Sequence, residues 1–145
     1  MKKLFIIAFC TLSLSACADN TKVISCDLLP EAAKTLMQSY VDVQQIVVVT
    51  QEGRSAWADY DVLLSDQSKW SFDGKGNLES VNVMNGVPED LVPAAIRATV
   101  TKMYPEAIIV KYSVDKDDRE QDVELNNRIE LTFDLNGALK EVDVD

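Results

Sequence analysis

Hydrophobic positions along the chain follow two periods, one helical and one strand-like, and the same order of periods occurs twice. Apolar side chains recur every three or four residues over 29–40 and again over 92–103. This spacing predicts two amphipathic helices, each with one side packed against a sheet. A proline opens each pattern. In the first copy Asp27 is the predicted N-cap, with Pro30 in the first helical turn.

Four short stretches of alternating apolar and polar side chains follow each predicted helix. They lie at residues 46–49, 60–64, 70–72 and 81–83 in the first half and at 108–110, 121–125, 129–133 and 142–144 in the second. Period two predicts strands with one buried side. The side chains predicted to face the core are Val62, Leu64, Val123 and Leu125. Leu78 and Leu139 each break the period directly after a turn, which predicts a β-bulge at both places.

Residues 70–78 and 131–139 are two versions of one hairpin, in which an aromatic residue precedes a turn rich in Asp, Asn and Gly. Asn126-Asn127 predicts a further tight turn. Because a unit of about 60 residues buries little apolar surface alone, the two units should share a core. We therefore predict an α+β fold of two tandem repeats, each a helix plus four antiparallel strands. The repeats should form one sheet of up to eight strands with both helices on one face.

The first residues have the pattern of a bacterial lipoprotein leader. Lys2 and Lys3 precede a short apolar run, and residues 14–17, Leu-Ser-Ala-Cys, match a lipobox. Cleavage before Cys17 would leave that residue acylated, and several acyl chains anchor a protein stably. The alternative is ordinary signal cleavage after Ala18. The predicted boundaries are 1–16 for the signal peptide, 17–27 for a tether, 28–84 for the first repeat, 85–90 for a linker and 91–145 for the second repeat.

Charge narrows the possible partners. The chain has a formal charge of −10, and loss of two leader lysines without any acid makes it −12. A nucleic-acid partner is therefore not expected, since no basic patch would release counterions from phosphates. An acidic surface favours a soluble, monomeric domain tethered to the membrane by its lipid alone. A protein partner would be basic or apolar where it makes contact.

Cys26 is the one thiol left if Cys10 leaves with the leader and Cys17 carries lipid. The simplest interpretation is a half-buried cysteine at the start of a helix. Without acylation, Cys17 and Cys26 could close a disulfide loop in an oxidising compartment, and an intermolecular disulfide is the third alternative.

Catalytic chemistry has little support in the sequence. The chain has no histidine, so a Ser-His-Asp hydrolase or a histidine-activated thiol is excluded. Two acidic turns, residues 73–77 and 115–118, could suggest Ca²⁺, but neither has a closing bidentate Glu at the required spacing. We expect no enzyme activity, no cofactor and no metal site. The spacing of the carboxylates neither excludes nor favours a pair that works as acid and base in the manner of a glycosidase.

The outward-facing positions of the two halves differ in a way that suggests a partner site. By strand parity the second half presents Glu120, Asp122, Glu124, Glu130 and Thr132, whereas the first presents Trp57, Asp59, Asp61, Leu63, Lys69 and Ser71. Either Ile46 and Val48 or Val47 and Val49 join them, because the first strand can be aligned in two ways. The predicted partner-binding residues are Trp57, Leu63, Asp59 and Asp61. Alternatively, the tether or the loop 51–55 covers this surface.

The second half carries Tyr104-Pro105-Glu106-Ala107-Ile108-Ile109 after the helix and the turn Phe133-Asp134-Leu135-Asn136-Gly137. With the proline-opened helix, these motifs resemble the PepSY-like family, also described as β-lactamase-inhibitor-like, over residues 28–145. The resemblance implies an α+β fold, an envelope location and a non-enzymatic binding or inhibitory role. Residues 40–43, Tyr-Val-Asp-Val, depart from the Tyr-Pro motif. Neither repeat has the internal cysteine pair of the secreted β-lactamase inhibitors, and no inhibitory residue is carried over.

The expected function is thus a lipid-anchored envelope binding module, acting as an inhibitor of an envelope peptidase or other enzyme through the outer sheet face. Its partner would be an unknown envelope protein or peptide. The alternative is a structural or scaffolding lipoprotein without a specific enzyme target. A carrier of small ligands is third, and it would need an apolar cavity between helices and sheet. The protein would sit on the periplasmic side or the surface of the outer membrane, or else be secreted or periplasmic.

Overall fold

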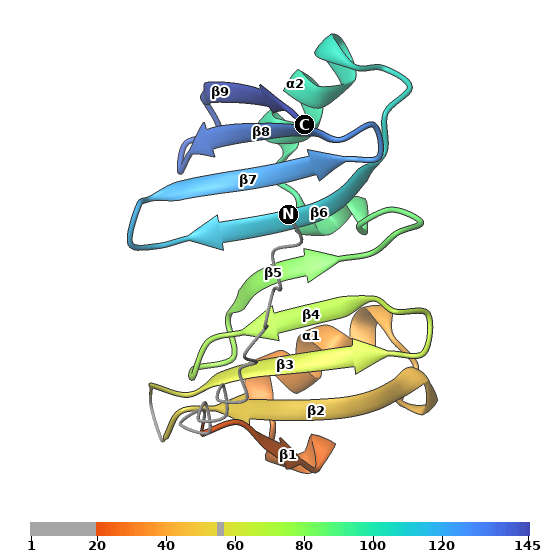
Figure 1. Cartoon of the computed structure of the whole chain (residues 1–145), viewed down its shortest axis with the longest axis vertical. Helices are drawn as coiled ribbons and strands as arrows, with labels where there is room; N and C mark the ends of the chain where they lie inside the picture. The colour runs from red at the N-terminus through yellow and green to blue at the C-terminus, as the bar shows by residue number, and fades with distance from the viewer. Residues whose placement is uncertain (1–19, 55–56) are drawn as a thin grey trace, which may run out of the picture.

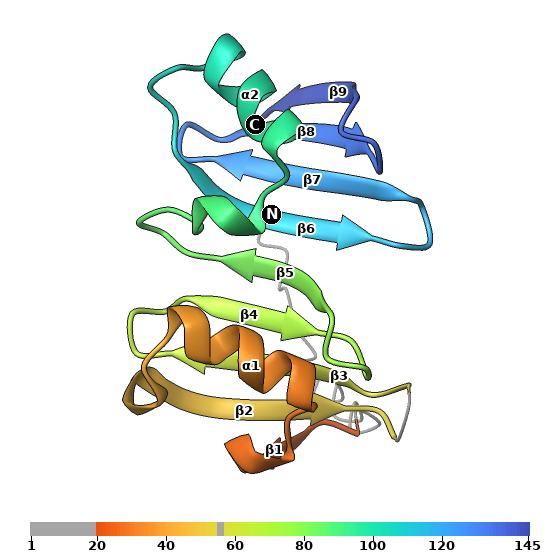
Figure 2. The same cartoon turned by 180° about the vertical axis from the view of Figure 1, so that it is seen from behind.

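The computed structural model describes residues 20–54 and 57–145. The predicted signal peptide and the predicted lipid site at Cys17 lie outside the described residues. The fold is α+β, with two α-helices and one antiparallel sheet of nine strands in the order β1 to β9 along the chain (Figures 1 and 2). Every strand therefore pairs with its neighbours in sequence, and the sheet has no crossover.

Each helix precedes a run of four strands. The first part of the described chain comprises β1 (Lys22–Ile24), α1 (Glu31–Tyr40), β2 (Ile46–Glu52), β3 (Asp59–Leu64), β4 (Lys69–Phe72) and β5 (Leu78–Asn82). The second comprises α2 (Ala94–Met103), β6 (Ile109–Asp115), β7 (Glu120–Leu125), β8 (Ile129–Asp134) and β9 (Leu139–Val144). Short 3₁₀ turns at Cys26–Leu28 and Glu89–Leu91 come just before the two helices, and a third at Val43–Gln45 precedes β2.

The sheet has one strand more than the eight predicted at most. The additional strand is β1, which pairs antiparallel with β2 and places Val23 opposite Thr50. The sequence assigned these residues to the tether, because three residues are too few to show a period. The second half of the predicted tether therefore forms the edge strand of the sheet.

Both α-helices begin later than the sequence suggested, so the prediction of Asp27 as an N-cap was wrong. Asp27 lies within a 3₁₀ turn, and Pro30 is the N-cap of α1. Leu29 has extended backbone angles, as expected for the residue before a proline, whose ring disfavours the helical region. Val92 before Pro93 is extended in the same way, and α2 begins directly after that proline.

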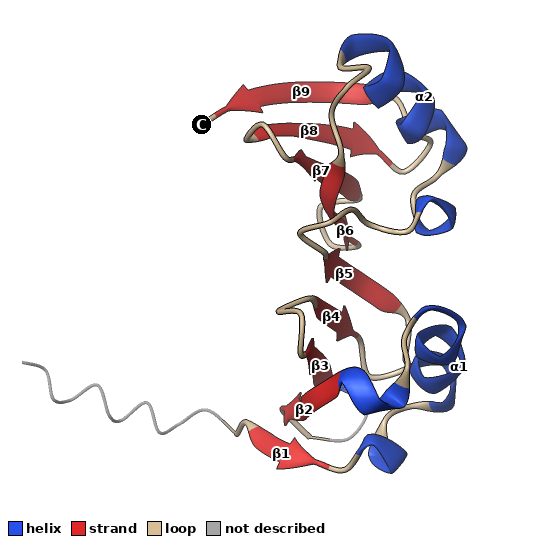
Figure 3. Ribbon diagram, turned by 90° about the vertical axis from the view of Figure 1, so that its right-hand side faces the viewer, coloured by secondary structure: helices blue, strands red, loops and turns tan. Residues whose placement is uncertain are grey.

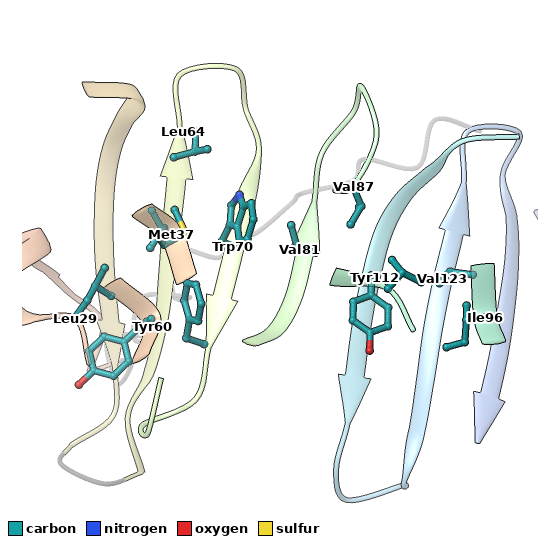
Figure 4. Packing of buried hydrophobic residues seen from close by; sticks show 14 of the residues in the cluster. Leu29, Met37, Tyr60, Leu64, Trp70, Val81, Val87, Ile96, Tyr112 and Val123 are labelled. Carbon is teal, nitrogen blue, oxygen red and sulfur yellow. The ribbon is translucent and has the colours of Figure 1, made fainter. Parts of the chain in front are cut away.

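A continuous row of apolar side chains crosses the sheet and defines its inner face. In strand order the row contains Val49, Val62, Trp70, Val81, Tyr112, Val123, Leu131 and Val142. All but Val142 are buried, and they share one cluster with Ala33 and Met37 of α1 and Ile96 and Val100 of α2 (Figure 4). The four side chains predicted to face the core, Val62, Leu64, Val123 and Leu125, are confirmed as buried.

Bulges set which side chains of the strands reach the inner face. The predicted bulges after the two turns are confirmed, since the register shifts where Phe72 meets Leu78 and where Phe133 meets Leu139. A further bulge lies in β2 between Ile46 and Val48. The row that contains Val48 faces outward, whereas Val49 is buried.

This β2 bulge overturns both predicted alignments of residues 46–49. Each alignment assumed strict period two, which Val47 interrupts as the extra residue of the bulge. Val47 is consequently exposed, and Ile46 packs against the core cluster.

Seen edge-on, the strands change direction progressively from β1 to β9, which is the usual twist of a sheet. In Figure 3, α1 and α2 lie to the right of the strands, and the left side of the sheet carries no helix. None of the helices in the described part of the chain has the length and apolar character needed to cross a bilayer.

Candidate functional site

The outer face of the sheet, opposite the buried row, carries an unbroken line of polar side chains across eight strands. This hydroxyl row consists of Thr50, Asp61, Ser71, Ser80, Ser113, Asp122, Thr132 and Glu141. Small hydroxyl side chains occupy its centre, where β5 meets β6. No helix of the described residues lies on this side of the sheet in Figure 3.

Two carboxylates in the hydroxyl row are fixed by hydrogen bonds from the neighbouring strand. Ser71 Oγ donates to Asp61 Oδ1 at 2.5 Å, and Thr132 Oγ1 donates to Asp122 Oδ1 at 2.6 Å. The same pair therefore occurs in both halves, and hydrogen bonds to a charged acceptor are among the stronger ones. Asp61 also binds Lys69 Nζ through Oδ2 at 2.8 Å. The two aspartates are thus positioned rather than freely mobile.

A second row of the outer face changes character from one end of the sheet to the other. This graded row consists of Val48, Leu63, Lys69, Asn82, Lys111, Glu124, Glu130 and Asp143. Its first two members are apolar, its middle is basic, and its last three members are acidic. A partner that lies across the strands would meet an apolar anchor at one end and negative charge at the other.

The predicted partner-binding residues do not form one patch. Trp57 is 89 % exposed and lies in the loop before β3, where its N–H donates to the carbonyl of Arg54. Leu63 lies six residues further along, at the other end of β3. At about 3.3 Å per residue the two are up to about 20 Å apart. Leu63 lies opposite Val48 and Lys69.

The predicted aspartates also separate along β3. Asp59 lies opposite Glu52, at the end of the strand near Trp57. Asp61 belongs to the hydroxyl row near the middle. The described part of the tether, residues 20–27, includes β1 at the sheet edge, and the remainder of the tether and of the loop 51–55 lies outside the described residues. Leu63 keeps 38 % of its surface exposed.

Carboxylates also gather where the hairpin loops of the two halves approach one another. Lys116 Nζ lies 2.6 Å from Asp73 Oδ2, and these residues are 43 positions apart in sequence. Burial opposes the ionisation of Asp73, yet the hydrogen bonds from Lys116 and Asn77 hold its pKa well below the usual range. Nearby, burial and then the carboxylate of Asp59 raise the pKa of Glu79.

We predict that Glu79→Gln raises the melting temperature at pH 7. A carboxyl group whose pKa is higher in the folded than in the unfolded state costs stability wherever both states are ionised, and the cost disappears as pH falls below the unfolded value. The gain from the glutamine should therefore vanish near pH 3. Thermal unfolding of both proteins at the two pH values measures it. An equal gain at both values would contradict a charge-based origin.

No cluster of side chains in the described chain has the composition of a metal site, since no three His, Cys, Asp or Glu residues are arranged to hold an ion. Cys26 is half-buried, as the simplest interpretation expected, and it forms no disulfide with another described residue. It lines a groove of about 370 Å³ beside α1, together with Leu29, Met37 and Ile46 and with the polar Lys34. This mixed lining differs from the apolar cavity that a small-ligand carrier would need.

Sequence reasoning missed the centre of the outer face. Ser80 and Asn82 of β5 and Lys111 and Ser113 of β6 join the two halves in one surface. That these four side chains face outward could have been predicted, because they flank Val81 and Tyr112, whose apolar side chains mark the inner face. The pairing of β5 with β6 could not be found, because it joins strands separated by a linker and a helix.

One antiparallel sheet and two helices place the described chain in the α+β class of folds. The chain belongs to the family described as "Putative beta-lactamase-inhibitor-like, PepSY-like", whose profile matches residues 58–141. A search of curated proteins finds no match.

Solved structures of similar fold include the following three. One, described as a putative calcium-regulated periplasmic protein from Bacteroides thetaiotaomicron, is 32 % identical with a TM-score of 0.77, and the match covers 85 % of this chain and 96 % of that one. A putative periplasmic protein of the DUF2874 family from Bacteroides vulgatus is 30 % identical with a TM-score of 0.79, covering 87 % and 98 %. A second Bacteroides vulgatus protein, described as a putative periplasmic protein of unknown function, is 24 % identical with a TM-score of 0.77, covering 85 % and 98 %.

Proposed function

We propose that this protein is a non-enzymatic binding module of the bacterial cell envelope, anchored by lipid at Cys17, which holds a partner protein on the outer face of its sheet. The periplasmic descriptions of the solved relatives support the location, and the inhibitor-like description of the family supports binding as the activity. In its finer form the proposal makes the protein an inhibitor of an envelope peptidase or other envelope enzyme. Its alternative is a scaffolding lipoprotein whose face only presents charge.

The observation that carries the proposal is the graded row of the outer face. Leu63 is exposed beside Val48, and the side chain of Lys69 follows on the next strand. An exposed aliphatic side chain next to a basic group, with acidic groups at the far end of the row, can orient a partner as well as hold it. Trp57 lies up to about 20 Å away along β3 and is a separate contact in this proposal.

The proposal treats the chain as two tandem repeats with both helices on the inner side. Each half has the same bulge after its glycine turn and the same Asp-to-hydroxyl pair on its outer face. In this organisation the outer face is the side left free in both repeats, so a partner can span the junction of β5 and β6.

Calcium regulation is the printed description of one relative, and we do not propose it for this chain. The carboxylate of Asp73 already binds the ammonium group of Lys116 at 2.6 Å. Its Oδ1 also accepts hydrogen bonds from the N–H groups of Lys75 and Asn77. Both oxygens are therefore engaged by groups of the protein itself.

The test is affinity capture from an envelope extract with the purified, tag-immobilised protein. We expect one partner at a constant stoichiometry, lost or reduced at least tenfold by Leu63→Glu, because a hot-spot side chain typically contributes about 1.4 kcal/mol or more. Lys75→Glu is the matched control, since Lys75 is an exposed turn residue outside the outer-face rows. Trp57→Ala tests in the same assay whether Trp57 makes a separate contact with the partner.

Capture that Leu63→Glu leaves unchanged would reject the outer face as the site. Absence of any stoichiometric partner would favour the scaffolding alternative. To separate inhibition from simple binding, the captured partner would be assayed for activity with and without the protein.

A further inference from the structure

The free edge of β9 differs from its counterpart β5 in what covers it. Both strands follow a glycine turn and a bulge, so that Val81 lies beside Trp70 and Val142 beside Leu131 on the inner face. Val81 is completely buried, whereas Val142 is 36 % exposed and Val144 is 72 % exposed. All six residues of β9 are exposed, and in Figures 1 and 2 this strand is the last of the sheet.

The cover of β5 is another strand. β6 pairs antiparallel with β5, placing Tyr112 opposite Val81 and Lys111 opposite Asn82. Val83, directly after β5, donates its N–H to the carbonyl of Val110 at 2.8 Å. Among the described residues no strand occupies the corresponding side of β9.

The backbone of β9 presents hydrogen-bonding groups on that free side. Asp145 N–H donates to Arg128 O, which places its N–H on the β8 side. Residues two apart in a strand direct their backbone groups alike, and adjacent residues direct them oppositely. The N–H groups of Val142 and Val144 therefore point away from β8. An edge of this kind is a template for strand addition.

We propose that the edge of β9 binds an extended segment of a partner protein as a tenth, antiparallel strand. By analogy with β6, the segment places an aromatic or aliphatic side chain over Val142. It places Lys or Arg opposite Asp143 on the outer face, where the chain also carries Glu141. Asp143 and Glu141 also end the two outer-face rows, but strand addition depends on the backbone of β9 and the outer-face site on Leu63, so either proposal can fail without the other.

Charge argues for a partner segment rather than a second copy of this chain. Two β9 strands in antiparallel pairing would bring Glu141 and Asp143 against the same acids of the other copy, and like charges opposite one another are destabilising. Pairing of β9 with the other free edge, β1, of a second copy would involve only the three residues of that strand. A segment with basic and apolar side chains avoids both the repulsion between acids and the short pairing.

The probe is an acetylated and amidated peptide with the sequence of residues 109–114, Ile-Val-Lys-Tyr-Ser-Val, which is the strand that covers β5. It is added at about 1 mM, a concentration suited to weak strand addition. We expect slower hydrogen exchange within residues 139–144 and shifts of the Val142 and Val144 amide signals. A peptide of the same composition in scrambled order is the control.

Val142→Pro removes an outward N–H without removing a β8–β9 hydrogen bond, as proline tolerates edge positions of this kind. It should weaken peptide binding at least tenfold, while Val142→Ile keeps it. If circular dichroism shows that the proline at 142 disturbs the fold, Val144→Pro at the strand end takes its place. A peptide with Glu in place of its Lys should bind up to about fivefold more weakly, and Asp143→Lys should restore its affinity.

Binding that the proline variants leave unchanged would overturn the proposal, as would protection at β1 or across the outer face in place of β9. Absence of any peptide effect, or concentration-dependent dimerisation through β9 in sedimentation experiments, would overturn it as well.

Discussion

Phe72→Ala should lower the free energy of unfolding by about 3–5 kcal/mol, the usual cost of removing a buried aromatic ring and leaving a cavity. Phe72 is completely buried on β4, and Phe133 is completely buried at the corresponding place on β8. We expect Phe133→Ala to cost about as much. Because small domains have only about 5–15 kcal/mol of stability, either change should shift chemical denaturation strongly.

The two phenylalanine variants also test whether the halves unfold together. The sheet is continuous and the buried cluster contains residues of both halves, so each variant should unfold in one transition detected alike by fluorescence and circular dichroism. Leu135→Ala, at a side chain 45 % exposed, is the control and should cost about 0.5 kcal/mol or less. Two separate transitions, with each variant affecting only one, would contradict a shared core.

Gly76→Ala should cost about 2–4 kcal/mol, which combines backbone strain with overpacking. Gly76 has a φ of +86°, and a Cβ there would lie 2.8 Å from the backbone nitrogen of Ala33 and 2.8 Å from Cβ of Pro30. The turn before β5 therefore packs against the first turn of α1 so closely that only glycine fits. Chemical denaturation of the purified variant measures the loss.

Gly74→Ala is the matched control, two residues earlier in the same turn. Gly74 is not among the residues with positive φ, so an alanine there should change stability by about 1 kcal/mol or less. Equal losses at the two positions would show that turn flexibility, rather than the contact with α1, sets the requirement for glycine.

Local patterns predicted the elements of this fold well, because each depends on neighbouring residues. The alternation at Val62 and Leu64 and the bulges after the Asp-Gly turns came from two-residue periods and their interruption. The helix starts were placed too early, because the cap signal at Asp27 competes with the proline at position 30. The proline determines where the helix starts, since it keeps Leu29 extended.

The candidate site was harder to predict, because its rows depend on registers between strands. Trp57 and Leu63 share a parity, but parity alone cannot show that Trp57 lies in the loop before β3 while Leu63 lies near the far end of that strand. The β2 bulge at Val47 carries no turn residue to mark it, so both alignments of that strand were wrong. Ser80 and Ser113 meet only because β5 pairs with β6, a contact set by the packing of the whole chain.

The family resemblance was confirmed, and it identifies the class of protein, which composition alone could not do. An acidic chain without histidine excludes several chemistries but selects no function, whereas the match over residues 58–141 assigns the chain to the PepSY-like family. The proposal that the outer face binds a partner depends on the side chains of this chain on that face and not on the family match.

Site-specific photocrosslinking in cells tests that placement most directly. A photoreactive phenylalanine analogue would replace Ser80, at the centre of the outer face, and in a second variant Gln38, exposed on α1. We expect a discrete crosslinked adduct from position 80 and none from position 38. An adduct from position 38 with none from position 80 would contradict the account, because the partner would then bind the helical side.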